Sequence, residues 1–172
     1  LSNKLSGVIE VDINRNKTQD VNVFGKKLLD VALTLLDKGE AGSIILKQGD
    51  LYKFIASKGY DKSLLGKITL TEKEMLTTKN DKPVIIKNIF NNPILKKKYR
   101  KRTERILEED GASRIKATIH APFIVDGEYI GGFFIDNFHS AEAFSEMDLK
   151  IVSSVSKLGL TYLRNMLLFR RA

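Results

Sequence analysis

Two amphipathic segments, one near each end of the chain, enclose a run of strand-like segments. Apolar residues recur at steps of three and four over residues 18–38 and again over residues 145–170, which predicts two long helices. Capping signals predict two shorter helices, at residues 71–79 and 92–110. Five strands are predicted between the long helices, at residues 43–47, 51–57, 84–86, 114–125 and 128–137. This order predicts an α+β fold around an antiparallel sheet.

Two turn dipeptides indicate how four of these strands pair. Gly49-Asp50 separates the first two strands, and Asp126-Gly127 separates the last two. Both dipeptides suit the two-residue turn of a β-hairpin. Gly131 and Gly132 lie inside the last strand, where glycine permits close packing rather than the approach of a phosphate.

The composition argues against several classes of function. The 172-residue chain fits one domain and contains no cysteine, which excludes disulfides, thiolate metal sites and a catalytic thiol. The two histidines, His120 and His139, argue against a histidine-rich metal site and leave few members for a serine–histidine triad. The sequence contains no recognisable nucleophile–base pairing, metal-ligand spacing or phosphate-binding glycine loop. We therefore expect neither an enzyme nor a metal site.

The sequence also bears on where the protein acts. No apolar run approaches the roughly 18 residues that a membrane span requires. The first residues lack the basic-then-apolar order of a signal peptide, and we expect a cytoplasmic protein. Because the chain begins with Leu1 rather than methionine, we expect it to be a part of a longer protein.

The net charge of +8 is concentrated in one short run. Six of the seven residues from Lys96 to Arg102 are basic. Such a run could attract the phosphate of a nucleotide or touch DNA. We favour the solvated face of a helix, because Glu104 and Glu108 follow at helical spacing and aromatic residues for base stacking are missing apart from Tyr99. Nucleic acid is therefore not an expected partner.

The last predicted hairpin carries a recognisable pattern. Its segments are Ala121-Pro122-Phe123-Ile124, Asp126-Gly127 and Ile130-Gly131-Gly132-Phe133-Phe134-Ile135-Asp136-Asn137. They resemble the closing strands of GAF domains, and Phe144-Ser145 with Asp148 and a long helix resembles the C-terminal end of that family. Gly42 to Leu46, and Lys58-Gly59-Tyr60 followed by Gly66, occupy the places of the family's first hairpin and loop. The resemblance covers roughly residues 18–170.

The resemblance implies a six-stranded antiparallel sheet with the terminal helices on one face. The other face would carry a small-molecule pocket roofed by the middle helices. GAF domains serve as sensory inputs for diguanylate cyclases, kinases, phosphodiesterases and transcription factors. The bilin-carrying and methionine-sulfoxide-reducing branches depend on cysteine, which this chain lacks. The Asn-Lys-Phe-Asp-Glu signature of cyclic-nucleotide-binding members has no clear counterpart, so the cofactor or ligand stays unknown.

Strand alternation then suggests which side chains line the pocket. Ala117, Ile119, Ala121, Phe123, Phe133 and Ile135 suit the face under the terminal helices. The candidate pocket residues are Thr118, His120, Phe134 and Asp136 from the hairpin, with Ile89, Phe90, Tyr99 and Ile106 as the roof. A mostly apolar cavity with a few polar groups is the usual form of a ligand site. The alternative is that Tyr99, Ile106 and Phe134 are core and that His120 is a hydrogen-bonded buried histidine; axial haem ligation by His120 is a minor alternative.

The C-terminal helix suggests how a signal would leave the domain. Ile151, Val155, Leu158, Tyr162 and Phe169 follow heptad-like spacing, with the polar Asn165 at a seam position. A second face, of Val152, Gly159 and Leu163, can pack on the sheet. We therefore expect a homodimer formed through this helix, which would lead to an attached output domain. The alternative is a helix that only covers the sheet.

The sequence as a whole predicts a linker at residues 1–16 and one GAF-like sensor domain at residues 17–172, ending in a signalling helix. The domain would sense a small molecule within a larger signal-transduction protein. Two alternatives remain open: a dimerisation scaffold without a ligand, and the effector domain of a transcription regulator.

Overall fold

A six-stranded antiparallel sheet forms the centre of the molecule. The computed structural model describes residues 9–12, 15–61 and 67–171. The resemblance implied a six-stranded antiparallel sheet, and this expectation is confirmed; the strand order is β4-β3-β2-β7-β6-β5. The strands are β2 (Ala41–Gln48), β3 (Leu51–Lys58), β4 (Thr69–Thr71), β5 (Val84–Lys87), β6 (Ala117–Val125) and β7 (Glu128–Asn137). Both predicted hairpins are confirmed: β2 pairs with β3 and β6 pairs with β7.

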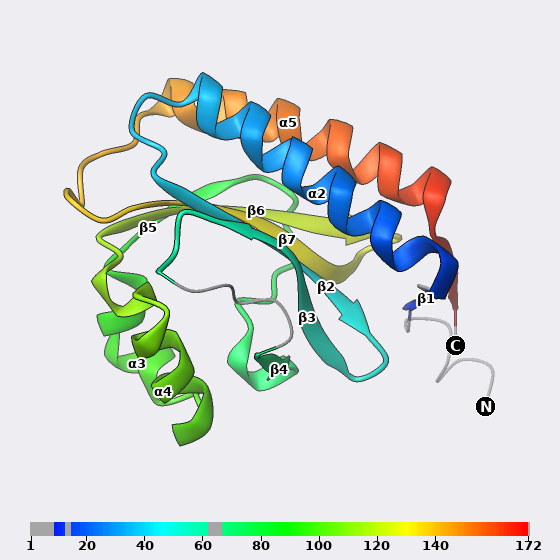
Figure 1. The fold of residues 1–172 in the computed structure, drawn as a ribbon, viewed down its shortest axis with the longest axis horizontal. Helices are drawn as coiled ribbons and strands as arrows, with labels where there is room; N and C mark the ends of the chain where they lie inside the picture. The colour runs from blue at the N-terminus through cyan, green and yellow to red at the C-terminus, as the bar shows by residue number, and fades with distance from the viewer. Residues whose placement is uncertain (1–8, 13–14, 62–66, 172) are drawn as a thin grey trace.

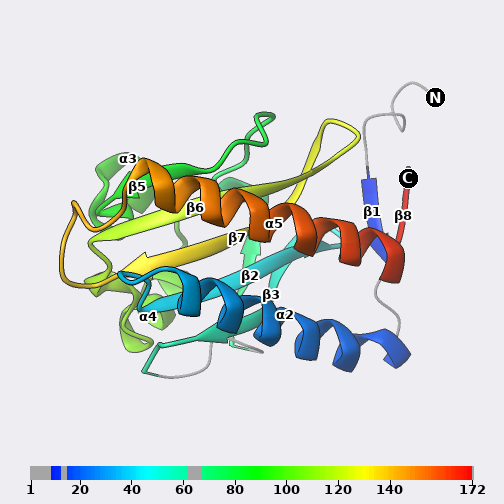
Figure 2. The same cartoon turned by 90° about the horizontal axis from the view of Figure 1, so that it is seen from above.

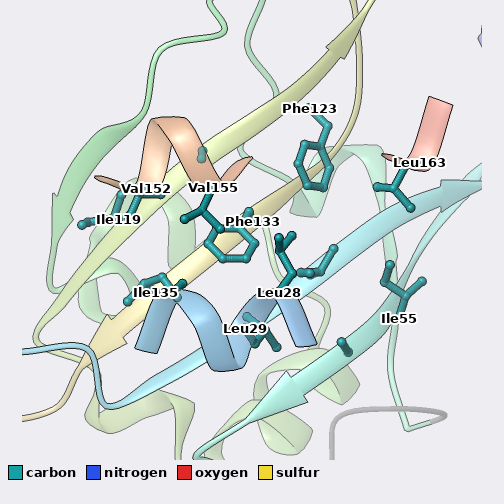
Figure 3. Close-up of a cluster of buried hydrophobic side chains, with 14 of the residues drawn as sticks. Leu28, Leu29, Ile55, Ile119, Phe123, Phe133, Ile135, Val152, Val155 and Leu163 are labelled. Atoms are coloured by element: carbon teal, nitrogen blue, oxygen red, sulfur yellow. The ribbon is translucent and has the colours of Figure 1, made fainter. Parts of the chain in front are cut away.

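Two long helices cover one face of this sheet. They are α2 (Arg15–Leu35) and α5 (Glu146–Met166), which pack against each other and lie side by side above the strands (Figures 1 and 2). Leu28, Leu29 and Val152 from the helices meet Phe133 and Ile135 from β7 in one buried cluster (Figure 3). This cluster is the larger of two cores, and its burial supplies most of the hydrophobic stabilisation on this side.

Shorter segments cover the opposite face. They include α3 (Pro93–Lys96), α4 (Lys101–Glu109) and the 3₁₀ turns Glu72–Glu74, Ile89–Asn91 and Ala112–Arg114, and α3 and α4 lie below the sheet in Figure 1. A second apolar cluster fills this side, with Ile45, Tyr52 and Tyr129 from the sheet and Phe90 and Leu107 from the cover. We call residues 72–115 on this side the lid, β5 excepted.

The lid differs from the predicted pair of short helices. The helix predicted at 71–79 is only a 3₁₀ turn, and the one predicted at 92–110 is broken between α3 and α4. The side chain of Glu74 accounts for both differences. The Glu74 carboxylate caps its own turn, but it also accepts the Arg100 amide at 3.0 Å. Arg100 is therefore extended, and a new helix begins at Lys101.

The C-terminal helix ends four residues before the predicted limit at Arg170. Leu167 is extended and buried, and the chain continues as β8 (Leu168–Arg171), which pairs antiparallel with β1 (Ile9–Asp12). Phe169 therefore lies in a strand and not in the predicted helical seam. The helix ends because the backbone of β8 pairs with β1. Helix α2 begins at Arg15, inside the predicted linker 1–16, whereas residues 1–8 and Gly66 lie outside the described residues.

The predicted seam on α5 is divided between the core and the surface. Ile151 and Val155 pack into the helix–sheet core. Leu158 is 66% exposed and Tyr162 is 41% exposed, and Asn165 is also exposed. The Tyr162 ring stacks on Phe24 of α2, with 3.7 Å between ring centroids.

Gly131 allows β7 to pass very close to β2. Its φ of 149° lies in a region that favours glycine. A Cβ at this position would lie 2.0 Å from the carbonyl oxygen of Ile45, so the predicted role in close packing is confirmed.

Replacing Gly131 with alanine should therefore destabilise the fold by about 3 kcal/mol or more, because backbone must move to relieve the overlap. Gly127→Ala is the matched control: Gly127 also has positive φ, at 81°, but a Cβ there would have nothing within 4 Å. The control should cost only about 1–2 kcal/mol. Urea unfolding of both variants measures the difference, and equal losses would show that the close approach is unimportant.

Candidate ligand-binding pocket

A cavity of about 100 Å³ lies between the sheet and the lid. Its sheet side is formed by Ser43, Ile45, Phe54, Thr118, Phe134 and Asp136. Its remaining walls are formed by Tyr60, Leu70, Glu74, Met75, Leu76, Ile89, Phe90, Tyr99, Leu107, Ala112 and Ile115. Most of the lining is apolar, with a few polar groups at the sheet, which is the usual composition of a small-molecule site.

The polar groups form a cluster around one buried carboxylate. Asp136 is only 2% exposed. One of its oxygens accepts a hydrogen bond of 2.8 Å from the Thr118 hydroxyl, and the other accepts one from the Tyr60 hydroxyl. Ser43 hydrogen-bonds Tyr60 in turn. Residues from β2, β6, β7 and the loop after β3 thus meet at the floor of the cavity.

This cluster has an unusual electrostatic environment. Burial raises the pKa of Asp136 to about 6, although the hydrogen bonds from Tyr60 and Thr118 act in the opposite direction. Burial, followed by the negative charge of Asp136, raises the pKa of Tyr60 well above its ordinary value, which keeps that hydroxyl a donor. Among the described residues, no lysine, arginine or histidine pairs with Asp136. Within residues 9–12, 15–61 and 67–171, the carboxylate therefore has no cationic partner.

A second buried carboxylate, that of Glu74, connects two segments of the lid. Glu74 lies 5% exposed in the cavity wall and accepts bonds of 3.0 Å from both the backbone amide and the Nε of Arg100. The Arg100 Nη2 also donates to the Thr69 carbonyl at 2.8 Å. Burial alone would raise the pKa of Glu74, but hydrogen bonds from Thr103, Thr71 and Arg100 and the Arg100 charge together lower it. Glu74 is thus ionised and fully paired, unlike Asp136.

Two further ion pairs tie the end of α4 to the chain beyond β3. Arg114 pairs with Asp61 at 2.8 Å, and Lys67 pairs with Asp110 at 3.3 Å. Arg114 also lies over the Phe138 ring, 5.5 Å from its centroid. These contacts hold the lid next to Tyr60, and several of them involve exposed side chains, so each contributes little stability by itself.

Six of the eight predicted pocket residues line this cavity: Thr118, Phe134, Asp136, Ile89, Phe90 and Tyr99. His120 does not line it. Its Nε2 lies 3.0 Å from the Tyr129 hydroxyl, and its ring stacks on Phe134 at 4.6 Å between centroids. Gly132 leaves room for this ring, because a Cβ there would lie 2.7 Å from the His120 Nε2. Burial lowers the pKa of His120 to about 4, so the neutral, hydrogen-bonded alternative describes this histidine.

Ile106 also lies outside the cavity. It borders a separate hollow beside Lys67 and Arg102, and Leu107 lines the cavity in its place. The prediction placed Tyr99 and Ile106 on one face of a continuous helix. Because a new helix begins at Lys101, the helical spacing that would place Ile106 on the same face as Tyr99 is interrupted at Arg100.

Several lining residues were not predicted from the sequence. Ser43 could have been found, since it lies directly opposite Phe134 in the β2–β7 register and shares its face. The sequence places Tyr60 only in a loop, and Glu74 only within the predicted helix at residues 71–79. Their positions depend on long-range contacts with Asp136 and Arg100, which no local pattern reveals.

The basic run does not face the cavity. Lys96, Lys97, Lys98, Lys101 and Arg102 are exposed on the outside of the lid, as expected for a solvated helix face. Arg100 differs from them because its guanidinium is paired with Glu74.

Neither a metal site nor a membrane span is visible in the described part of the chain. Residues 9–12, 15–61 and 67–171 contain no group of three or more side chains that could hold a metal ion. Within the same residues, no helix is both long and apolar enough to cross a bilayer.

Solved structures share this architecture. No protein-family model matches the sequence, and no curated protein matches it. The GAF domain of PixJ from Thermosynechococcus elongatus, in its blue-light-absorbing form, superposes with a TM-score of 0.63 at 10% identity, covering 90% of each chain. The type II free methionine-R-sulfoxide reductase from Thermoplasma acidophilum has a TM-score of 0.62 at 18% identity, covering 88% of this chain and 96% of the other.

A third similar structure is the GAF domain of a phosphoenolpyruvate-protein phosphotransferase from Coxiella burnetii. Its TM-score is 0.59 at 21% identity, and the match covers 88% of each chain. The six-stranded antiparallel sheet with its helices matches these structures. The chain has the fold of a GAF domain.

Proposed function

We propose that this chain is a regulatory domain that binds a small molecule and signals through its terminal helices to another part of a larger signal-transduction protein. A diguanylate cyclase, a kinase or a phosphodiesterase would be a suitable output. The observation that carries the proposal is the apolar cavity with a buried polar floor under a separate lid. Similar folds occur in a domain of a sensor histidine kinase protein from Sinorhizobium meliloti and in the light-absorbing PixJ domain.

The proposal does not include catalysis. One similar structure is a methionine sulfoxide reductase, but thiol-based reduction requires cysteine, and this chain has none. The polar groups of the cavity floor hydrogen-bond one another, an arrangement suited to binding.

Strands β6 and β7 give the cavity a direct connection to the helices. Thr118 and Asp136 contact the cavity, whereas their neighbours Ile119 and Ile135 lie in the core beneath α2 and α5. Because side chains alternate across a strand, a ligand that moves either strand also moves the surface on which the helices pack. Such coupling requires that the ligand bind one arrangement better than the other.

The proposal predicts that the purified chain carries a non-covalent ligand, which native mass spectrometry would detect as mass lost on denaturation. Ala112→Phe should abolish this extra mass, because the ring would fill a cavity whose wall includes Ala112. Ala141→Phe, in the β7–α5 loop away from the lining residues, is the matched control and should retain it. A wild-type chain without extra mass would instead support the alternative of a scaffold without a ligand.

We also propose that two copies of the chain associate through the outer surface of the helix pair. Helices α2 and α5 expose Val31, Leu35 and Leu158 by 49%, 54% and 66% respectively. These residues are not needed for the helix–sheet core, so they remain free to bury apolar surface against a second copy. This surface keeps Leu158 and Tyr162 of the predicted seam and loses Ile151 and Val155, which the core uses.

Leu158→Asp should weaken the dimer by roughly 30-fold or more, about 2 kcal/mol, because a charge would replace an apolar contact at its centre. Size-exclusion chromatography with light scattering, over a range of concentrations, measures the change. Thr77→Asp, exposed on the lid side of the sheet, introduces the same charge away from the helix pair and should leave the dimer intact. A wild-type chain that stays monomeric at all concentrations would contradict the dimer proposal.

A further inference from the structure

The ligand itself can be narrowed to a chemical class. We infer that the cavity takes a small apolar molecule carrying a cationic nitrogen, an ammonium or amidinium group, which binds the carboxylate of Asp136. This inference rests on the proposed function, since it assumes that the cavity binds a ligand.

The carboxylate of Asp136 has hydrogen-bonding capacity that the described side chains do not use. A carboxylate has about four acceptor positions. In Asp136 one oxygen accepts from Thr118 and the other from Tyr60, and no other side chain that the structure describes occupies the second position on either oxygen. Asp136 also lines the cavity, so a donor in the cavity can reach them. Two acceptors on one carboxylate match a nitrogen that carries two or three N–H groups.

The negative charge of Asp136 also favours a cationic ligand. A buried carboxylate is costly unless an opposite charge pairs with it, and no cation among the described residues pairs with Asp136. Three cations beside the cavity already have acidic partners: Arg100 binds Glu74, Arg114 binds Asp61, and Lys67 binds Asp110. Since none of the described residues supplies this counter-charge, a cationic group on the ligand would stabilise the ionised form of Asp136 at neutral pH.

The same charges disfavour an anionic ligand. The acidic groups that line the cavity are Asp136 and Glu74, and no basic residue is among the lining residues that the structure describes. A carboxylate or phosphate at the cavity floor would meet one negative charge without a compensating positive one. The basic residues of the lid are exposed on its outer side and do not alter this balance.

The rest of the lining limits the size and polarity of the molecule. Phe134, Ile45 and Leu107 face the cavity, so the body of the ligand should be apolar. A volume of about 100 Å³ is smaller than the roughly 150 Å³ cavity that holds benzene in an engineered protein. The enclosed part of the ligand therefore has only a few heavy atoms.

Three probes of nearly equal shape test this inference: isobutylamine, isobutanol and isobutyrate. Each is titrated into the ¹⁵N-labelled chain at pH 7.5, and the amide shifts of Ser43, Thr118 and Asp136 report occupancy of the cavity. Isobutylamine should bind at least tenfold tighter than isobutanol, and isobutyrate should bind weakest. Asp136→Asn should remove this preference, whereas Asp50→Asn, in the exposed β2–β3 turn, should preserve it.

Thermal unfolding of the ligand-free Asp136→Asn chain separates a binding role from a structural one. The amide can still bond Thr118 and Tyr60, and the buried charge is gone, so the melting temperature should stay the same or rise. A marked fall would show that Asp136 serves the fold, and would overturn the inference.

The remaining outcomes are distinguishable from failure of the proposed function. Isobutanol or isobutyrate binding as tightly as isobutylamine would overturn the ligand class and leave the binding function standing. A natural ligand that is retained through purification and lacks a basic nitrogen would likewise overturn the ligand class and leave the binding function standing. Absence of saturable binding by all three probes would also overturn the class, and it would overturn the binding function only if the native mass spectrum shows no ligand either.

Discussion

Both faces of strands β6 and β7 are covered by other parts of the chain, and the rest of the structure depends on this double burial. Their alternate residues are buried under α2 and α5 on one face and under the lid on the other. The strands therefore admit few polar side chains, and those they have must be hydrogen-bonded. Thr118, Asp136 and His120 meet this requirement in different ways. Thr118 donates to Asp136, which also accepts from Tyr60 at the cavity, and His120 pairs with Tyr129 away from it.

The two buried carboxylates of the cavity, Glu74 and Asp136, have different partners. Glu74 is satisfied by Arg100 and by nearby hydroxyl and amide groups, so its role is to hold the lid in place. In the part of the chain that the structure describes, the side chain of Asp136 has only hydroxyl partners, and we propose that a ligand neutralises its charge. A lid held by a paired carboxylate and a floor carboxylate that has hydrogen bonds but no described cationic partner suit a sensor, because a cationic ligand would gain most from the second group.

Local patterns in the sequence predicted the layers of this fold well. Turn dipeptides located both hairpins, and strand alternation placed Ile119 and Phe133 in the helix-side core and Thr118 and Asp136 on the pocket side. The errors arose where a distant contact overrides local preference. The bond from the Arg100 amide to Glu74 breaks a predicted helix, and pairing with β1 ends α5 before Phe169. Tyr60 could not be assigned because its role depends on Asp136, 76 positions away in the sequence.

The central claim is that occupancy of the cavity is communicated through the sheet to the terminal helices. Hydrogen–deuterium exchange tests it most directly, by comparing the chain as purified with the same chain unfolded, dialysed and refolded to remove its ligand. The account predicts faster amide exchange after removal, both in the lid over residues 88–115 and in α5. Unchanged exchange in α5, with a change confined to the lid, would show binding without transmission and would contradict the claim.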